Sequence, residues 1–91
     1  MPWLYILKCT DGSYYTGTTL DLERRISEHQ SGMPGSYTFD RRPVEIVFSE
    51  EFFSWPEAIN REIQVKKWSR RKKEALMKSD WKTLRSLARG K

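Results

Sequence analysis

Residues 3–17 have the sequence WLYILKCTDGSYYTG and predict the unit on which the fold is built. Residues 3–7 are aromatic and aliphatic without a polar interruption, which is typical of a strand buried on both faces. Residues 9–13 are rich in turn formers, and residues 14–18 return to strand formers. The stretch therefore predicts a β-hairpin whose first strand lies at the centre of its sheet.

The length of the hairpin turn decides which tyrosines share a face. A three-residue loop over Thr10–Gly12, with Gly12 left-handed in a bulge, pairs Cys9 with Ser13 and puts Tyr5 and Tyr15 on the same side. A two-residue loop puts the two tyrosines on opposite sides, because side chains alternate along a strand. Only the longer loop is compatible with a site that uses both phenols.

The remainder of the chain alternates helix and strand signals and predicts an α+β fold. Thr18, Thr19 and Asp21 offer capping oxygens before a helix over residues 22–30 that ends by Gly32. Residues 32–43 are expected to form a loop, and residues 44–48 alternate like a half-exposed third strand. Ser54 and Pro56 predict the start of a long helix that runs from Trp55 to about Arg70. A shorter basic helix follows, and residues 80–88 predict a last one.

Composition limits the broad class of the protein. A chain of 91 residues has room for one domain with one modest core. Cys9 is the only cysteine, so no intramolecular disulfide is expected, and the N-terminus does not resemble a signal peptide. The longest apolar run, Trp3–Leu7, is far shorter than the roughly 20 residues of a membrane helix. A soluble cytoplasmic protein without membrane contact is expected.

The net charge of +5 is distributed unevenly. Residues 1–60 contain five Lys and Arg against nine Asp and Glu, whereas residues 61–91 contain twelve against three. A basic surface of this density attracts a polyanion such as nucleic acid. A solvated, lysine-rich helix surface explains the charge about equally well.

Arg25 and His29 are the first candidates for chemistry. At about 100° per residue they share a helical stripe with Leu22 and Ile26, whereas Arg24 points to the opposite side. A guanidinium one turn from an imidazole is a suitable anion site, because its fork of donors fits phosphate oxygens. The alternatives are structural: a histidine hydrogen-bonded in place and an arginine paired with a carboxylate.

Glu62 is the third candidate, because the helical wheel puts it on the apolar stripe of Trp55, Ala58, Ile59 and Ile63. Burying a carboxylate costs several kcal/mol unless it is paired or binds a metal. Lys66, four residues on, offers an ion pair worth only about 0.3–0.5 kcal/mol if exposed. A divalent cation that keeps several waters, as Mg²⁺ does, satisfies the carboxylate better.

The order and spacing of these residues match a known pattern. Trp3-Leu4-Tyr5 and Tyr15-Thr16-Gly17 stand where one nuclease family has Gly-Ile-Tyr and Tyr-Ile-Gly, and Arg25 follows Tyr15 by ten residues. Residues 58–62 are similar to the helix that carries that family's metal-binding glutamate. Over residues 2–75 the chain resembles the GIY-YIG nuclease family, closest in style to its small single-domain bacterial members. Trp3 and Thr16 depart from the motif at positions that tolerate change.

The resemblance implies a three-stranded antiparallel sheet flanked by helices, with the site on one sheet face beside the first and long helices. Residues 1–80 would form the GIY-YIG nuclease-type domain and residues 81–91 a C-terminal basic helix and tail. The implied reaction is hydrolysis of a DNA phosphodiester. Glu62 would hold one Mg²⁺ or Mn²⁺, Arg25 would stabilise phosphoryl charge, and His29 would bond the phosphate or relay a proton. Tyr5 or Tyr15 would be the general base, with a slight preference for Tyr15.

The basic C-terminal half would bind flanking phosphates without reading bases. The residues expected to do so, together with Arg25, are Lys66, Lys67, Arg70, Arg71, Lys72 and Lys73. The leading hypothesis is a structure-selective or weakly specific DNA endonuclease in repair or recombination, directed by DNA structure or by a targeting protein partner. The alternatives are a nucleic-acid-binding module of the same fold with little or no cleavage activity, and a domain that binds an acidic protein.

Overall fold

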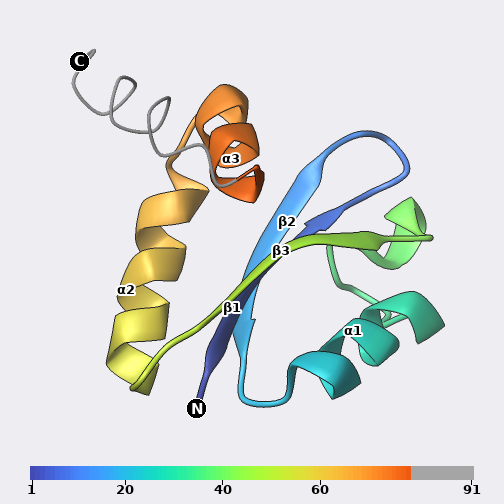
Figure 1. Ribbon diagram of the computed structural model, residues 1–91. Helices are drawn as coiled ribbons and strands as arrows, with labels where there is room; N and C mark the ends of the chain where they lie inside the picture. The colour runs from blue at the N-terminus through green and yellow to red at the C-terminus, as the bar shows by residue number, and fades with distance from the viewer. Residues whose placement is uncertain (79–91) are drawn as a thin grey trace.

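The computed structural model describes residues 1–78 and contains three strands and three α-helices (Figure 1). The helix predicted over residues 80–88, like the tail assigned to residues 81–91, lies outside the described residues. The elements, in chain order, are β1 (Trp3–Lys8), β2 (Tyr14–Thr19), α1 (Leu22–Ser31), a 3₁₀ turn (Phe39–Arg41), β3 (Glu45–Glu51), α2 (Trp55–Lys66) and α3 (Arg70–Met77).

The strands form one antiparallel sheet in the order β2-β1-β3. The central strand is β1, as its uninterrupted apolar sequence predicts, and Leu4, Tyr5, Ile6 and Leu7 are all buried. On the β3 side the register shifts between Ile6 and Leu7, which marks a β-bulge. The α+β architecture with a three-stranded antiparallel sheet is therefore confirmed.

The hairpin between β1 and β2 closes through a three-residue loop. The Cys9 amide donates to the Ser13 carbonyl at 2.9 Å, and Gly12 is left-handed with φ of 85°. In this register Tyr5 lies opposite Gly17 and Leu7 lies opposite Tyr15, so both phenols project from one face. The ring centroids of Tyr5 and Tyr15 are 6.2 Å apart, which confirms the three-residue alternative.

Helices cover both faces of the sheet. Leu4 and Ile6 pack with Val65 of α2 and with Leu76 of α3, forming one core cluster. On the opposite face Tyr5, Leu7 and Cys9 pack with Leu22 and Ile26 of α1, forming a second. Figure 1 shows α2 and α3 on one side of the strands and α1 on the other. The buried residues of α1 and those of α2 and α3 therefore pack on opposite faces of the sheet.

The helix ends follow the capping residues. Asp21 caps α1 by accepting from the Arg24 amide, and Gly32, with φ of 101°, ends it. Ser54 caps α2 by accepting from the Glu57 amide. The predicted end of α2 near Arg70 is wrong, because the helix stops at Lys66 and Ser69 caps a separate helix, α3. A serine at an N-cap satisfies an otherwise unpaired amide, and this favours a new helix start over a continuous helix.

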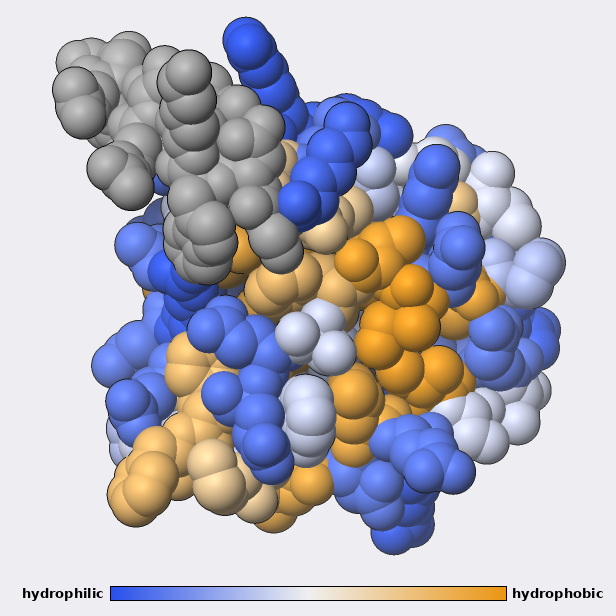
Figure 2. Space-filling view, viewed as in Figure 1, coloured by the Kyte–Doolittle hydropathy of each residue, from blue (hydrophilic) through white to orange (hydrophobic). Residues whose placement is uncertain are grey.

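The buried side of α2 differs from the stripe indicated by the helical wheel. Ala58 and Val65 are fully buried, whereas Trp55 is 42% and Ile63 50% exposed. Figure 2 shows apolar side chains gathered across the middle of one face of the molecule, with hydrophilic ones around them. None of the helices within residues 1–78 is long and apolar enough to cross a membrane.

Among the glycines up to residue 78, Gly17 leaves the least room for a side chain. A Cβ atom there would lie 2.6 Å from the Tyr5 hydroxyl oxygen and 2.7 Å from the adjoining ring carbon. We expect Gly17→Ala to lower the free energy of unfolding by about 1–3 kcal/mol, because the buried Tyr5 ring has to move. Urea denaturation measures the loss, and the NMR signals of the Tyr5 ring report the displacement.

Gly12→Ala is the matched control for this prediction. Its Cβ would meet nothing within 4 Å, but its φ of 85° disfavours a side chain. This variant is expected to lose stability through backbone strain alone and to leave the Tyr5 signals unchanged. Equal displacement of Tyr5 in both variants would contradict the proposed steric effect at Gly17.

Candidate functional site

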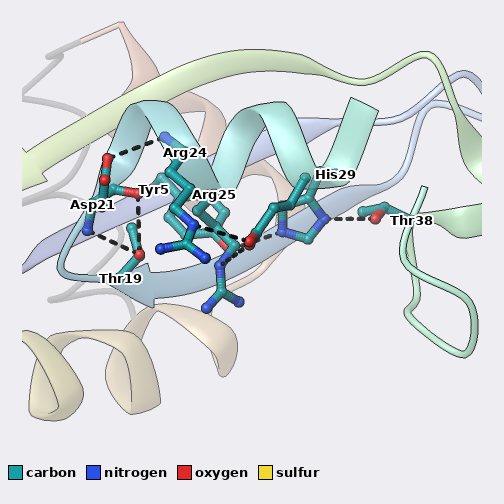
Figure 3. Close-up of polar contacts among 8 residues, drawn as sticks. Tyr5, Thr19, Asp21, Arg24, Arg25, His29 and Thr38 are labelled. Carbon is teal, nitrogen blue, oxygen red and sulfur yellow. Dashed lines mark hydrogen bonds and ion pairs between the residues drawn. The ribbon is translucent and has the colours of Figure 1, made fainter. Parts of the chain in front are cut away.

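His29 is the buried centre of the candidate site. Its side chain on α1 has no exposed surface. Its Nε2 atom lies 2.9 Å from the Tyr5 hydroxyl, and its Nδ1 atom lies 2.7 Å from the hydroxyl of Thr38 in the loop before β3 (Figure 3). Each ring nitrogen has one hydroxyl partner, whichever tautomer is present. The histidine therefore joins β1, α1 and the loop in one hydrogen-bonded chain.

Burial sets the protonation state of this chain. Desolvation, followed by the nearby Arg25 charge, lowers the pKa of His29 below its ordinary value, so the imidazole is neutral near pH 7. Desolvation, followed by the Tyr15 phenol, raises the pKa of Tyr5 far above its ordinary value, and Glu62 adds to the rise while Arg25 opposes it. Tyr5 is therefore a neutral phenol whose hydroxyl is occupied by His29.

Tyr15 lies within a group of aromatic rings. Its ring centroid is 5.2 Å from that of His29 and 6.0 Å from that of Tyr37, on which it stacks. Arg41 covers Tyr37 at 4.0 Å from the ring centroid, donates to the Tyr37 carbonyl, and pairs with Asp11 of the hairpin turn at 3.0 Å. These contacts fix Tyr15 between the core and the loop. Unlike Tyr5, the Tyr15 side chain is only partly buried.

Arg25 reaches the surface beside this group. Its side chain is 39% exposed, and the two carboxylate oxygens of Glu28 form ion pairs with Arg25 at 3.3 Å and with Arg24 at 3.4 Å. Figure 3 shows both guanidinium groups pointing the same way from α1. The prediction that Arg24 points to the opposite side is therefore wrong, because its long side chain folds back toward Glu28.

Glu62 comes from α2, the helix on the other face of the sheet. Its side chain is only 16% exposed, and its carboxylate pairs with Lys66 at 3.4 Å, which is the intrahelical ion pair that the sequence offers. Its charge nevertheless acts on the Tyr5 phenol and contributes to raising the Tyr5 pKa. The carboxylate is therefore electrostatically coupled to the residues around β1 and α1.

The donor set limits what kind of cation fits. No group of three His, Cys, Asp or Glu side chains that could hold a metal occurs within residues 1–78. A single carboxylate suits a Mg²⁺-like ion that keeps most of its waters and takes further oxygens from a phosphate. The residues thus fit one hard divalent cation at Glu62, and they do not form a closed structural metal site.

The basic residues of α2 and α3 divide into two groups. Arg70 donates to the Gly12 carbonyl at 2.7 Å and pairs with Glu74, and Lys72 lies over the Trp68 ring. Burial and the nearby Lys66 lower the pKa of Lys73. In contrast, the side chains of Lys67 and Arg71 are exposed and form no ion pair with any other residue up to 78. Part of the basic cluster holds α3 against the hairpin.

The structure brings four of the five predicted site residues together and couples the fifth to them. Tyr5, Tyr15 and His29 are in mutual contact, Arg25 lies beside Tyr5, and Glu62 acts on Tyr5 through its charge. Sequence reasoning missed the residues that hold these groups in place. They are Arg24, Glu28, Tyr37, Thr38 and Arg41. Residues 36–38 lie in a loop, and a loop has no periodicity that assigns its side chains to a face.

Comparison with known proteins defines the class. The model of the GIY-YIG catalytic domain, a domain of a nuclease superfamily, matches residues 1–75. The chain therefore belongs to the GIY-YIG family.

Its relatives within the family are UPF0213 proteins. The one from Halobacterium salinarum is 46% identical over 76 residues, which cover 84% of this chain and 99% of the relative. The solution NMR structure of a UPF0213 protein from Bacillus halodurans is 48% identical, with a TM-score of 0.57 over 86% of this chain and 84% of the other. A protein from E. faecalis, also solved by NMR, is 42% identical with a TM-score of 0.60, over 85% and 82% of the two chains.

The depressed pKa of His29 predicts a pH dependence of stability. Because the unfolded state binds a proton near the ordinary pKa of 6.5 and the folded state does not, the stabilisation is complete above that value and decreases as pH falls below it. We expect urea denaturation between about pH 7.5 and 5 to show this decrease in the free energy of unfolding. In a His29→Gln variant the decrease should be smaller, because the contribution of His29 is absent. An NMR titration that put the His29 pKa at or above its ordinary value would contradict the prediction.

Proposed function

We propose that this protein is a metal-dependent DNA endonuclease that hydrolyses phosphodiester bonds with structure-selective or weak sequence specificity. The observation that carries the proposal is the Glu62 side chain of α2, which is only 16% exposed, pairs with Lys66, and adds its charge to the rise in the pKa of Tyr5, the phenol beside Arg25 and His29. An ion pair with one exposed lysine on the same helix contributes little to stability, so stability alone does not explain a carboxylate at this position. Membership of a catalytic-domain family supports a chemical reason for keeping it.

The roles proposed for the residues follow from their accessibility. Arg25 is half exposed and offers its donors to a phosphate, in exchange for Glu28. Tyr15 is the phenol that a substrate and its attacking water can reach, whereas Tyr5 is buried and bonded to His29. Because both nitrogens of His29 are occupied, its proposed role is to hold Tyr5 and pass a proton along the chain, and phosphate contact is not part of it.

Glu62 is the residue proposed to hold one Mg²⁺ or Mn²⁺. When bound, such an ion would supply Lewis-acid polarisation of the scissile phosphate. In this structure Lys66 neutralises the Glu62 carboxylate, so the Lys66 ammonium has to move away before a cation binds. The exposed position of Lys66, at 54%, permits this movement.

A second candidate is a nucleic-acid-binding module of the same fold with little or no cleavage activity. Two ion pairs favour it, because Glu28 occupies Arg25 and Lys66 occupies Glu62 in this structure. In that case the basic side chains of α2 and α3 would bind DNA, and the buried His29 chain would serve stability alone.

The setting proposed for the endonuclease is DNA repair or recombination in the cytoplasm. The match to the catalytic domain covers residues 1–75, and we propose that DNA structure or a protein partner selects the target.

Cleavage assays distinguish the two candidates. On nicked, flapped and branched DNA with Mg²⁺ or Mn²⁺, we expect Glu62→Gln to lower the cleavage rate at least about 100-fold and to leave DNA affinity within a few-fold. The matched control is Glu57→Gln on the same helix, whose exposed side chain accepts a hydrogen bond from the Ser54 hydroxyl. Identical rates for wild type and Glu62→Gln on every substrate would refute the endonuclease proposal.

The exposed basic residues predict the salt dependence of DNA binding. Replacing both Lys67 and Arg71 by Gln should weaken binding and reduce the slope of log affinity against log salt by roughly 0.9 for each phosphate that is no longer neutralised. Lys8→Gln, which removes an exposed charge at the end of β1, is the control. An equal reduction per charge in the control would show that net charge, and no particular helix surface, controls binding.

A further inference from the structure

A hollow of about 430 Å³ opens beside Arg25, and apart from Arg25 and Glu28 its lining residues have no role in the proposed function. It lies where the end of β2, the start of α1 and the first turn of α2 meet, and it is lined by Leu20, Arg24, Arg25 and Trp55 among others. Its volume is within the range of roughly 300–1,000 Å³ that small ligands occupy. Arg25 belongs to both the hollow and the candidate site, so a substrate phosphate at Arg25 places the adjoining nucleotide at this hollow.

The apolar walls of the hollow are unusually exposed. Trp55 is 42% exposed and Leu20 is 69% exposed, and neither belongs to either core cluster. A tryptophan at the surface of a concave region provides a flat face for stacking, and base stacking on aromatic side chains is tolerant of sequence. Trp55 and Leu20 therefore offer an apolar surface on which a planar group can bind.

The polar side of the hollow carries two guanidinium groups. Arg24 is 76% exposed, and it shares the Glu28 carboxylate with Arg25. The other acid in the lining, Asp21, caps α1 by accepting from the Arg24 amide. The charges in the lining balance, so an incoming phosphate has to replace Glu28 at one or both arginines. The hollow therefore offers an apolar wall for a neutral base and, beside it, two arginines that can exchange Glu28 for a phosphate. These two features match the two parts of a nucleotide.

We infer that this hollow binds one unpaired nucleotide next to the scissile phosphate, with its base against Trp55 and its phosphate at Arg24. A base inside a duplex is already stacked on both sides, whereas an unpaired base has a free face that can stack on Trp55. The inference rests on the proposed function and narrows it: the preferred substrate is DNA with an unpaired nucleotide at the point of cleavage.

Binding measurements test the inference independently of cleavage. In a Glu62→Gln background, fluorescence anisotropy compares a flapped DNA with the same flap lacking the base nearest the junction, and with blunt duplex. We expect Trp55→Ala to weaken binding of the intact flap about 5- to 100-fold, and to leave the abasic flap and the duplex nearly unchanged. Trp55→Phe should retain most of the affinity, because it keeps an aromatic face.

Ile63→Ala is the matched control, since it removes an exposed apolar side chain from the same helix outside the lining of the hollow. A 2-aminopurine base at the junction should lose fluorescence on binding to protein with Trp55 and should lose less with Trp55→Ala. Thermal denaturation confirms that the variants are folded.

Several results would overturn the nucleotide site. They are an equal effect of Trp55→Ala on intact flap, abasic flap and duplex, an effect no larger than that of Ile63→Ala, and a change in self-association with unchanged DNA affinity. Failure of the endonuclease proposal looks different, because wild type would then cleave none of the substrates while Trp55 still contributed to base-dependent binding.

Discussion

The register of the β1–β2 hairpin is the constraint on which the site depends. Side chains alternate between the two faces of a strand, so a slip of one residue in the turn would send Tyr15 to the face covered by α2 and α3. The three-residue loop with a left-handed Gly12 keeps Tyr5 and Tyr15 together under α1. The same register puts Gly17 opposite Tyr5, where any side chain would displace the phenol.

The buried His29 links the hairpin to segments that are distant in the sequence. A neutral imidazole without exposed surface needs a partner for each nitrogen, and Tyr5 and Thr38 provide them from two other segments. The loop before β3 is consequently positioned by a core residue, and through Tyr37 it stacks on Tyr15. The two tyrosines end in different states: Tyr5 is a buried member of the scaffold, whereas Tyr15 remains reachable from solvent.

The charged groups of the candidate site, Arg25 and Glu62, lie on helices that cover opposite faces of the sheet. Each group forms an ion pair with a partner that can be exchanged. Arg25 on α1 is paired with Glu28, and Glu62 on α2 is paired with Lys66. Both partners are on the same helix as the group they neutralise and are partly exposed, so each pair costs little to separate. Under the proposed function, an anionic substrate at Arg25 and a cation at Glu62 would replace these partners without a rearrangement of the core.

The sequence by itself determined the hairpin and the starts of the capped helices, because strand alternation, helical periodicity and capping are local properties. It also supplied five candidate site residues, through the helical wheel and through the order and spacing of the motif residues. It did not determine the partners of His29, the direction of Arg24 or the end of α2. Thr38 lies in a loop without periodicity, Arg24 folds back toward Glu28, and Ser69 starts a separate helix. Only the tertiary structure decided these features, because each depends on a group distant in sequence or on competition between two local preferences.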